Sequence, residues 1–97
     1  MGGMQMSGVM TPASMAYATA SAQMMTDMAL TYTCDADVDF ATGMIPHHQA
    51  AVAMAQIELD YGTDPELRAL AAAIIAAQET EIAQMEAWLA AHPAPVQ

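Results

Sequence analysis

The sequence predicts an all-α protein, an up-and-down bundle of three main helices in a single domain. Alanine, the strongest helix former, occurs 23 times in 97 residues. Three long segments space their apolar residues with the period of a helix, and capping or turn-forming residues separate them. A chain of this length buries one modest core. Cores that small often depend on a partner chain or a metal ion, so a second chain could complete the bundle.

The N-terminal region predicts a flexible arm followed by the first helix. Residues 1–12 are rich in glycine, serine and methionine and show no periodicity. Helical spacing extends from about Ala13 to Tyr32. One stripe of this helix holds Tyr17, Ser21, Met24, Met25, Met28 and Tyr32, and the opposite side holds Thr19, Gln23, Thr26 and Asp27. Thr33-Cys34-Asp35 breaks the pattern, and Asp35 can cap the next helix.

The second helix is expected from about Ala36 to Asp60. One of its faces carries Phe40, Met44, His47, His48, Ala51, Ala55 and Glu58. Gly43 and Pro46 interrupt this helix. Because proline removes one backbone hydrogen bond, we expect a kink or a short break immediately before the two histidines. Tyr61-Gly62 ends the helix with a C-terminal glycine.

The third helix is expected from Pro65 to about Ala91. Thr63-Asp64-Pro65-Glu66 has the spacing of a capping box, with proline in the first turn. The inner stripe of this helix holds Leu67, Leu70, Ile74, Gln78, Glu81, Met85 and Trp88, while Glu79, Thr80, Gln84 and Glu86 point outward. Pro93 and Pro95 stop the helix. The bundle domain therefore spans residues 13–92, and a short tail spans 93–97.

The charge of the chain excludes several classes of partner. Eleven carboxylates stand against one cation, Arg68, for a formal net charge of −10. Nucleic acids and anionic membrane surfaces attract lysine and arginine, so we expect neither as a partner. No stretch approaches the roughly 18 apolar residues of a membrane span, and the N-terminus lacks the features of a signal peptide, so an exported form would be the mature one. Cys34 is the only cysteine, and no internal disulfide can form.

Polar and soft residues occur at the centre of helical stripes, where core residues are expected. His47 and His48 lie on the stripe of the second helix, and Glu81 and Met85 lie on that of the third. Buried polar groups cost free energy unless they are satisfied, so this clustering on facing stripes indicates a purpose.

The spacing of these residues predicts mixed thioether and imidazole sites for a metal. Met44 precedes the two histidines by three and four residues and can share a metal with either of them. Met54 lies two turns beyond His47, about 10 Å along the axis, and belongs to a different site unless another helix intervenes. Thioethers favour Cu(I) or Ag(I) over zinc, iron or magnesium. A zinc site would need four Cys, His or carboxylate ligands, and a di-iron bundle would need Glu-x-x-His motifs.

Several of these residues also have a purely structural interpretation. A methionine stripe at helical spacing is often plain core, and Met24, Met25 and Met28 by themselves fit that interpretation. His47 could be a satisfied core histidine, and His92 could be a solvated helix end.

The polar candidates have structural interpretations as well. Gln78 and Glu81 fit a supporting role around a site better than a role as ligands. Three aspartates lie at the start of the second helix; they are Asp35, Asp37 and Asp39. They are better interpreted as the helix cap and as partners of the helix dipole than as a calcium site. Cys34 precedes a helix, but no neighbouring feature activates it as a nucleophile.

Three stretches carry a resemblance to a known family: DVDFATGMIPHHQAAVAMA at 37–55, YGTDPELR at 61–68 and AQETEIAQMEAWL at 77–89. Their most specific element is Met-Ile-Pro-His-His with a methionine six residues after the second histidine. In these stretches, over about residues 24–89, the chain resembles the bacterial family catalogued as domain of unknown function 305. That family includes the CopM-like copper-binding proteins.

The resemblance implies a ferritin-like or four-helix-type bundle, export to the periplasm or cell exterior, and a role in copper or silver binding and resistance. The ligands that it implies are Met44, His47, His48, Met54 and Met85, with Met24 and Met28 as a Met-x-x-x-Met pair in the first helix. The chain departs from the family in two ways. Cys34 stands where a glycine is usual, and it could add a thiol ligand. The chain is also short, so a fourth helix would be missing or supplied by a partner.

Our leading hypothesis is a non-enzymatic copper(I)-binding protein that sequesters the metal or passes it between a donor and an acceptor protein outside the cytoplasm. We expect it to form a homodimer. The alternative is a helical interaction module whose methionine-rich face docks onto a partner without metal. An enzyme, such as a copper oxidase, would need an open redox site that the sequence does not show.

Overall fold

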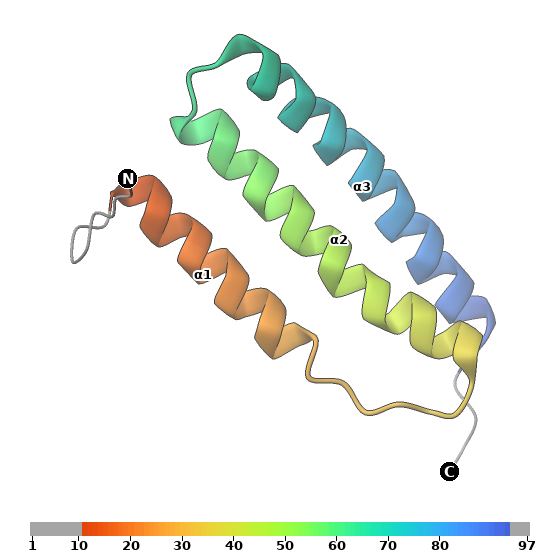
Figure 1. Ribbon diagram of the computed structural model, residues 1–97. Coiled ribbons are helices and arrows are strands. Elements are labelled where there is room, and N and C mark those ends of the chain that lie inside the picture. The colour runs from red at the N-terminus through yellow and green to blue at the C-terminus, as the bar shows by residue number, and fades with distance from the viewer. Residues whose placement is uncertain (1–10, 94–97) are drawn as a thin grey trace.

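The computed structural model describes residues 11–93, so the predicted arm up to Met10 and the tail from Ala94 lie outside the described residues. The described chain forms three α-helices, α1 (Pro12–Asp27), α2 (Ala36–Tyr61) and α3 (Pro65–Ala91), and contains no strand (Figure 1). Successive helices run in opposite directions (Figure 1). The predicted all-α, up-and-down fold is confirmed.

Helix α1 begins one residue before its predicted start and is shorter than predicted. Thr11, which we assigned to the arm, is the N-cap, and its hydroxyl accepts the amide hydrogen of Ser14. The helix ends at Asp27, whereas the predicted end was Tyr32. The linker that follows is held by Asp39 of α2, whose carboxylate accepts from both the backbone N–H and the hydroxyl of Thr33 at 2.9 Å. This anchor draws the linker across the start of α2, so the chain leaves the helix before Tyr32.

The predicted inner stripe of α1 is partly wrong. Met25 is 71% exposed, Tyr32 is 67% exposed, and Ser21 is exposed as well. Three residues that we expected to face away instead line a groove between α1 and α2; they are Thr19, Gln23 and Asp27. The reason is that α1 has a single neighbouring helix, so the side facing α2 is set by where α2 lies and not by the most apolar stripe.

Helix α2 has the predicted bounds to within one residue. Asp35 is its N-cap and accepts the amide hydrogens of Asp37 and Val38. The kink or break that we expected before the histidines does not interrupt the helix, which continues through Pro46. Proline removes one backbone hydrogen bond from the helix. The ring of Pro46 is buried in the groove with α1, and this burial offsets part of the cost. Gly62 is the C-cap, as predicted from the sequence.

Helix α3 has the predicted bounds but a different cap. The N-cap is Asp64, whose carboxylate accepts the amide hydrogen of Leu67 at 2.9 Å, and not Thr63. Pro65 then occupies the first turn, where its missing N–H costs nothing. Arg68, in the next turn, reaches back to the end of α2 and donates to the carbonyl oxygens of Leu59 and Gly62 at 2.6 and 3.1 Å. The only cation of the chain therefore ties the two helices together at their connection.

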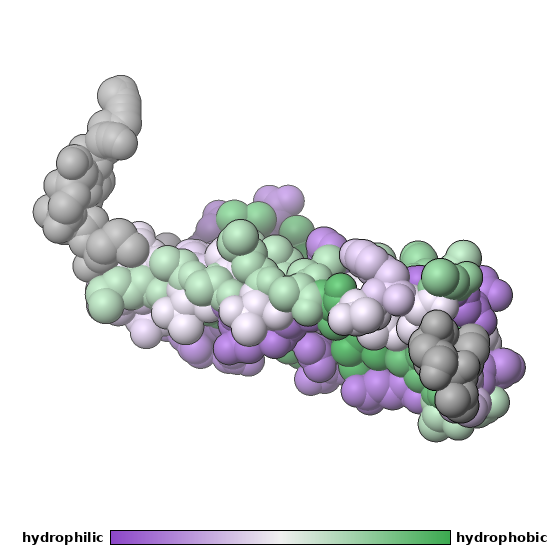
Figure 2. All heavy atoms as spheres, turned by 90° about the horizontal axis from the view of Figure 1, so that it is seen from below, coloured by the Kyte–Doolittle hydropathy of each residue, from purple (hydrophilic) through white to green (hydrophobic). Residues whose placement is uncertain are grey.

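The three helices form a layer with α2 in the middle (Figure 1). Both neighbours pack on α2, whereas no Cα atom of α1 comes within 8 Å of one in α3 over the described residues. Besides Pro46, five apolar side chains are buried, and three of these are alanine; the five are Val38, Ala41, Ala55, Ile57 and Ala71. No side chain of the described part is less than 2% exposed. Apolar residues lie open at the surface on the side drawn in Figure 2, so this layer has very little interior.

Candidate functional site

His48 is held between α2 and α3 by two polar contacts. Its Nδ1 lies 2.9 Å from the carbonyl oxygen of Met44, one turn earlier in α2. A carbonyl oxygen can only accept, so Nδ1 carries the hydrogen in this contact. The other ring nitrogen, Nε2, reaches α3 and lies 2.6 Å from Oε1 of Glu81. The backbone of α2 thus fixes the ring and presents Nε2 to α3.

The two partners of this contact differ in their exposure. The side chain of His48 is 13% exposed, whereas that of Glu81 is 55% exposed. The imidazole is therefore fixed within the helix interface, while the carboxylate can move aside into solvent. The carboxylate accepts a hydrogen from Nε2 in this contact, so a metal ion would have to replace that hydrogen as Glu81 moves aside. The ring would then keep its hydrogen on Nδ1, and an N–H donated to a backbone carbonyl is the usual support of a metal-binding histidine.

Two methionines lie at the next level of the same interface. The helices are antiparallel, so Met44, one turn before His48, is at the level of Met85, one turn after Glu81. Both methionines are half-buried. Met85 also lines a pocket of about 410 Å³ together with Phe40 and Trp88. The register thus brings three of the predicted ligands to one region between α2 and α3, with two thioethers and one imidazole.

The other predicted ligands lie elsewhere. His47 is exposed, because adjacent residues on a helix diverge by about 100°. Met54 is 48% exposed and lies two turns further along α2. Met24 lines the groove on the α1 side, and Met28 is the half-buried C-cap of α1. The predicted set of seven therefore separates into one group at the α2–α3 interface and four residues outside it.

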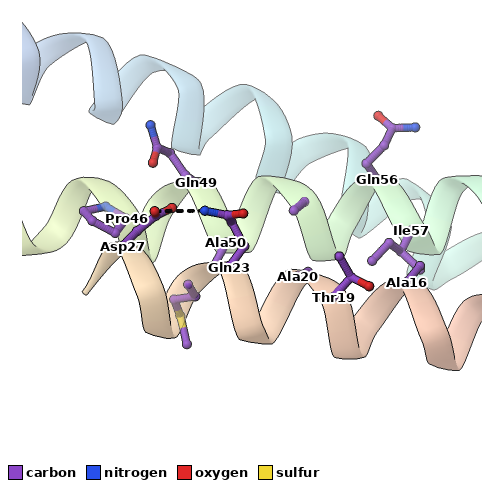
Figure 3. Close-up of a pocket in the computed structure, with 12 residues that line it drawn as sticks. Ala16, Thr19, Ala20, Gln23, Asp27, Pro46, Gln49, Ala50, Gln56 and Ile57 are labelled. Carbon is purple, nitrogen blue, oxygen red and sulfur yellow. Dashed lines mark hydrogen bonds between the residues drawn. The ribbon is translucent and has the colours of Figure 1, made fainter. Parts of the chain in front are cut away.

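The groove between α1 and α2 has a volume of about 540 Å³ (Figure 3). Its lining is mostly alanine methyl groups and glutamine amides, and one of these amides, on Gln23, donates to Asp27 at 2.9 Å, the dashed line in the figure. Met24 is the soft ligand that it contains. The groove offers shape and amide groups, and its chemistry is much poorer than that around His48.

Two features of the site region were not predicted. The sequence placed Glu81 on the inner stripe, but its direct contact with His48, 33 residues earlier in the chain, depends on the register of α2 and α3. Cys34 is exposed and has a φ of 73°, in the left-handed region that favours glycine. The strained backbone at Cys34 gives a physical reason for a glycine at this position.

The remaining sequence-based assignments are structural. Asp35 is the N-cap of α2, and Asp37 and Asp39 lie in its first turn, in agreement with the prediction. The bond from Thr33 to Asp39, which anchors the linker, was not predicted. His92 is the exposed C-cap of α3, and its ring stacks on Trp88 with centroids 4.2 Å apart. Between residues 11 and 93 no group of three or more His, Cys, Asp or Glu side chains is placed to hold a metal ion.

Comparison with known proteins identifies the family. The family model described as "Domain of unknown function (DUF305)" matches residues 1–89. The chain belongs to the DUF305 family. A relative of this DUF305 chain is the "Uncharacterized protein L153" of Acanthamoeba polyphaga mimivirus, which is 38% identical over 53 residues. The match covers 55% of the chain and 35% of the viral protein, so the chain spans about a third of that relative.

The family match includes α1, α2 and nearly all of α3. It therefore contains the whole His48 region. None of the three helices in the described part of this DUF305 chain has the length and apolarity needed to cross a membrane.

Proposed function

We propose that this DUF305 protein binds Cu(I), and Ag(I) as a chemical analogue, through His48, Met44 and Met85 between α2 and α3. The observation that supports the proposal is the orientation of His48, whose Nδ1–H is fixed on the carbonyl of Met44 and whose Nε2 points to α3. One neutral imidazole and two neutral thioethers form a soft donor set, which matches Cu(I) and matches Zn(II) or Mg(II) poorly.

The surroundings of His48 suit a monovalent cation. Glu81 supplies one negative charge at 2.6 Å from Nε2, enough to neutralise one Cu(I). The carboxylate is exposed, so it can turn towards solvent when a metal takes its place on Nε2, and it stays close enough to balance the charge. The net charge of −10 attracts cations to the protein as a whole.

The role that we propose is binding and transfer of the metal and not catalysis. It is the role of the CopM-like members that the sequence resembles: sequestering or delivering copper outside the cytoplasm, in the periplasm or at the cell exterior, as part of copper homeostasis or resistance. Fractionation of cells that produce the native gene product tests the location. Recovery of the protein only with cytoplasmic markers would contradict it.

Substitution of the methionines separates metal binding from packing. Met44→Leu and Met85→Leu keep volume and apolarity and cost less than about 1.5 kcal/mol of folding stability. Each change deletes a sulfur, so we expect Cu(I) affinity to fall tenfold or more, which corresponds to about 1.4 kcal/mol. The measurement is a Cu(I) titration against a chromophoric chelator, with helicity and melting followed by circular dichroism.

The matched control is Met15→Leu, because Met15 is 56% exposed and lies on α1, which does not pack on α3. It should change neither Cu(I) affinity nor melting. His48→Ala should weaken Cu(I) binding as well, at a higher cost in stability because it opens space in the interface. Leucine variants that bind Cu(I) as tightly as the parent would show that these methionines are packing residues.

The alternative function is a helical interaction module with a methionine-rich docking face. It predicts no competition with the chelator for Cu(I) in the parent protein. A competition series with Zn(II) completes the comparison, because equal or tighter zinc binding would contradict the soft character of the site.

A further inference from the structure

The face of α2 that lies between its two neighbours is only partly covered. It carries a row of residues spaced alternately by four and three positions, which is the spacing of a coiled-coil seam. We call this row the α2 seam; its members are Phe40, Met44, His47, Ala51, Met54, Glu58 and Tyr61. Phe40, Met54 and Tyr61 are 65%, 48% and 50% exposed, and His47 is exposed as well. Met44, Ala51 and Glu58 are half-buried, and Tyr17 of α1 lines a pocket with Ala51 and Met54. The seam therefore has the spacing and composition of a helix interface and is only partly covered by the described chain.

The apolar surface continues from the α2 seam onto α3. Met54 shares a pocket with Leu67 and Leu70, which are 52% and 54% exposed. At the other end of the seam, Phe40 shares a pocket with Trp88.

The opposite face of the same two helices carries amide and carboxylate groups beside apolar ones. A shallow depression there is lined by eight side chains, half of them polar; they are Gln49, Gln56, Glu79, Glu86, Val52, Ala53, Ile82 and Ala83. Among the seam residues only Glu58 carries a negative charge, although the chain has eleven carboxylates. Carboxylates are thus sparse along the seam, and covering it would bury little charge.

We propose that a second copy of this chain covers the α2 seam, related by a two-fold axis that crosses α2 at the Ala50–Ala51 peptide. In this arrangement His47 of each copy meets Met54 of the other, and each such pair is a Cu(I) site shared between the chains. The metal part of this proposal rests on the proposed function, whereas the docking part does not.

The choice of axis follows from the residues of the seam. A two-fold interface must be self-complementary, so residues equally far from the axis on either side must fit each other. His47 and Met54 are equally far from the Ala50–Ala51 peptide and pair imidazole with thioether. Phe40 and Tyr61 are also equally far from it and pair two exposed aromatic rings.

Gly43 supplies an independent observation for the same axis. A Cβ atom built on Gly43 would meet nothing within 4 Å, so there is open space beside this residue. Gly43 and Glu58 are equally far from the Ala50–Ala51 peptide on opposite sides. The open space at Gly43 is therefore compatible with a Glu58 side chain of a second copy at the same level, while the carboxylate of Glu58 lies beside Gly62 of its own chain.

The occupant is a second copy because the single layer lacks an interior. Five buried apolar side chains, three of them alanine, are few for a stable domain of this length. Two layers stacked on their seams would place both apolar faces in a shared core. The small residue Ala51 at the centre permits close approach of the two α2 helices.

The shared metal site resolves a geometric difficulty within one chain. His47 and Met54 are two turns apart, about 10 Å along the axis, so they cannot bind one ion together. Across the two-fold axis each His47 lies at the level of Met54 of the other copy. The dimer would thus hold two such sites, in addition to the site at His48 within each chain.

Disulfide cross-linking tests the docking part in the metal-free full chain. Helix axes pack about 8–10 Å apart and Cα atoms lie about 2.3 Å from the axis, so the two Ala51 Cα atoms would approach to about 4–5 Å, within reach of a disulfide. In a Cys34→Ala background, Ala51→Cys should form a disulfide-linked dimer rapidly under mild oxidation. Gln49→Cys, on the opposite face of α2, is the matched control and should remain largely unlinked. Equal yields from the two variants, or no dimer from Ala51→Cys, would overturn the docking arrangement.

Complementation between two variants tests the shared site. His47→Ala and Met54→Leu each destroy both cross-chain pairs in their own homodimer, so each should lose the same Cu(I) equivalents. When the two variants are unfolded, mixed in equal amounts and refolded together, half of the dimers are mixed. Each mixed dimer has one intact His47–Met54 pair, so about a quarter of the lost Cu(I) equivalents should return.

The outcomes distinguish this inference from the proposed function. If cross-linking succeeds but Cu(I) binds nowhere, the proposed function fails and the docking arrangement stands. If Cu(I) binds in a manner that depends on His48 but mixing restores nothing, the shared site is wrong and the proposed function stands.

Discussion

Arg68 offers the sharpest test of how the helices are held together. Its guanidinium donates from Nη1 to the carbonyl oxygens of Leu59 and Gly62 at 2.6 and 3.1 Å. These carbonyls lie in the last turn of α2 and at its cap, where the helix itself offers no N–H partner. Arg68 is also the only lysine or arginine in the chain, so no other side chain of that kind can replace it. We therefore expect Arg68→Met, which keeps the apolar stem and removes the donors, to destabilise the protein.

The expected magnitude follows from these contacts. A hydrogen bond to a charged group contributes about 1.5–3 kcal/mol, and a cation at a helix C-terminus adds about 0.3–1 kcal/mol. Because Arg68 is half-buried and the second contact is long, we take the lower part of the range, about 2–3 kcal/mol in total. Domains of this size have a free energy of unfolding of about 5–15 kcal/mol, so the loss would be a large fraction of it.

The assay is urea unfolding followed by circular dichroism. With an m-value of about 1–2 kcal/mol/M, the loss should lower the midpoint by about 1–3 M. Parent and variants must be compared at one protein concentration, because association makes the midpoint depend on concentration. Arg68→Lys keeps the charge but not the planar donor group and should lie between the two. A midpoint for Arg68→Met within about 0.2 M of the parent would refute the role assigned to these hydrogen bonds.

Two further substitutions test local features of the fold. Cys34→Gly should stabilise the protein by about 0.5–1 kcal/mol. A φ of 73° is strained for cysteine and unstrained for glycine, and the greater entropy of glycine in the unfolded state offsets part of this gain. A lower midpoint in the same urea assay would contradict this prediction. Asp64→Ala should cost about 1 kcal/mol through loss of the bond to the Leu67 amide, whereas Thr63→Ala should be nearly neutral. The reverse order would restore the capping box that the sequence suggested.

The sequence by itself determined the helices that have strong local signals. The bounds of α2 and α3 follow from Asp35, Gly62, Pro65 and the prolines after residue 92, which act within one or two turns of the chain. Periodicity also put His48, Met44 and Met85 on facing stripes. The Met-Ile-Pro-His-His element carried the resemblance to the DUF305 family, and the family match confirms it.

Errors arose where a distant contact competes with a local pattern. α1 was extended to Tyr32 because the spacing of its methionines continues, but the carboxylate of Asp39 anchors Thr33 outside the helix. A kink or a short break was expected at Pro46, but α2 continues through this residue, which is buried in the groove with α1. Periodicity alone describes one helix at a time and contains no information about these neighbours.

Only the tertiary structure decided which residues meet. The contact between His48 and Glu81 requires the antiparallel register of two helices, and no local pattern fixes that register. The same is true of the layered arrangement, in which α1 and α3 lie on opposite sides of α2 and leave its seam only partly covered. A hydrophobic stripe shows that a face is suited to burial, but what buries it depends on where the other helices lie. For this reason the sequence predicted seven candidate ligands, whereas the register of α2 and α3 brings only Met44, His48 and Met85 to one region.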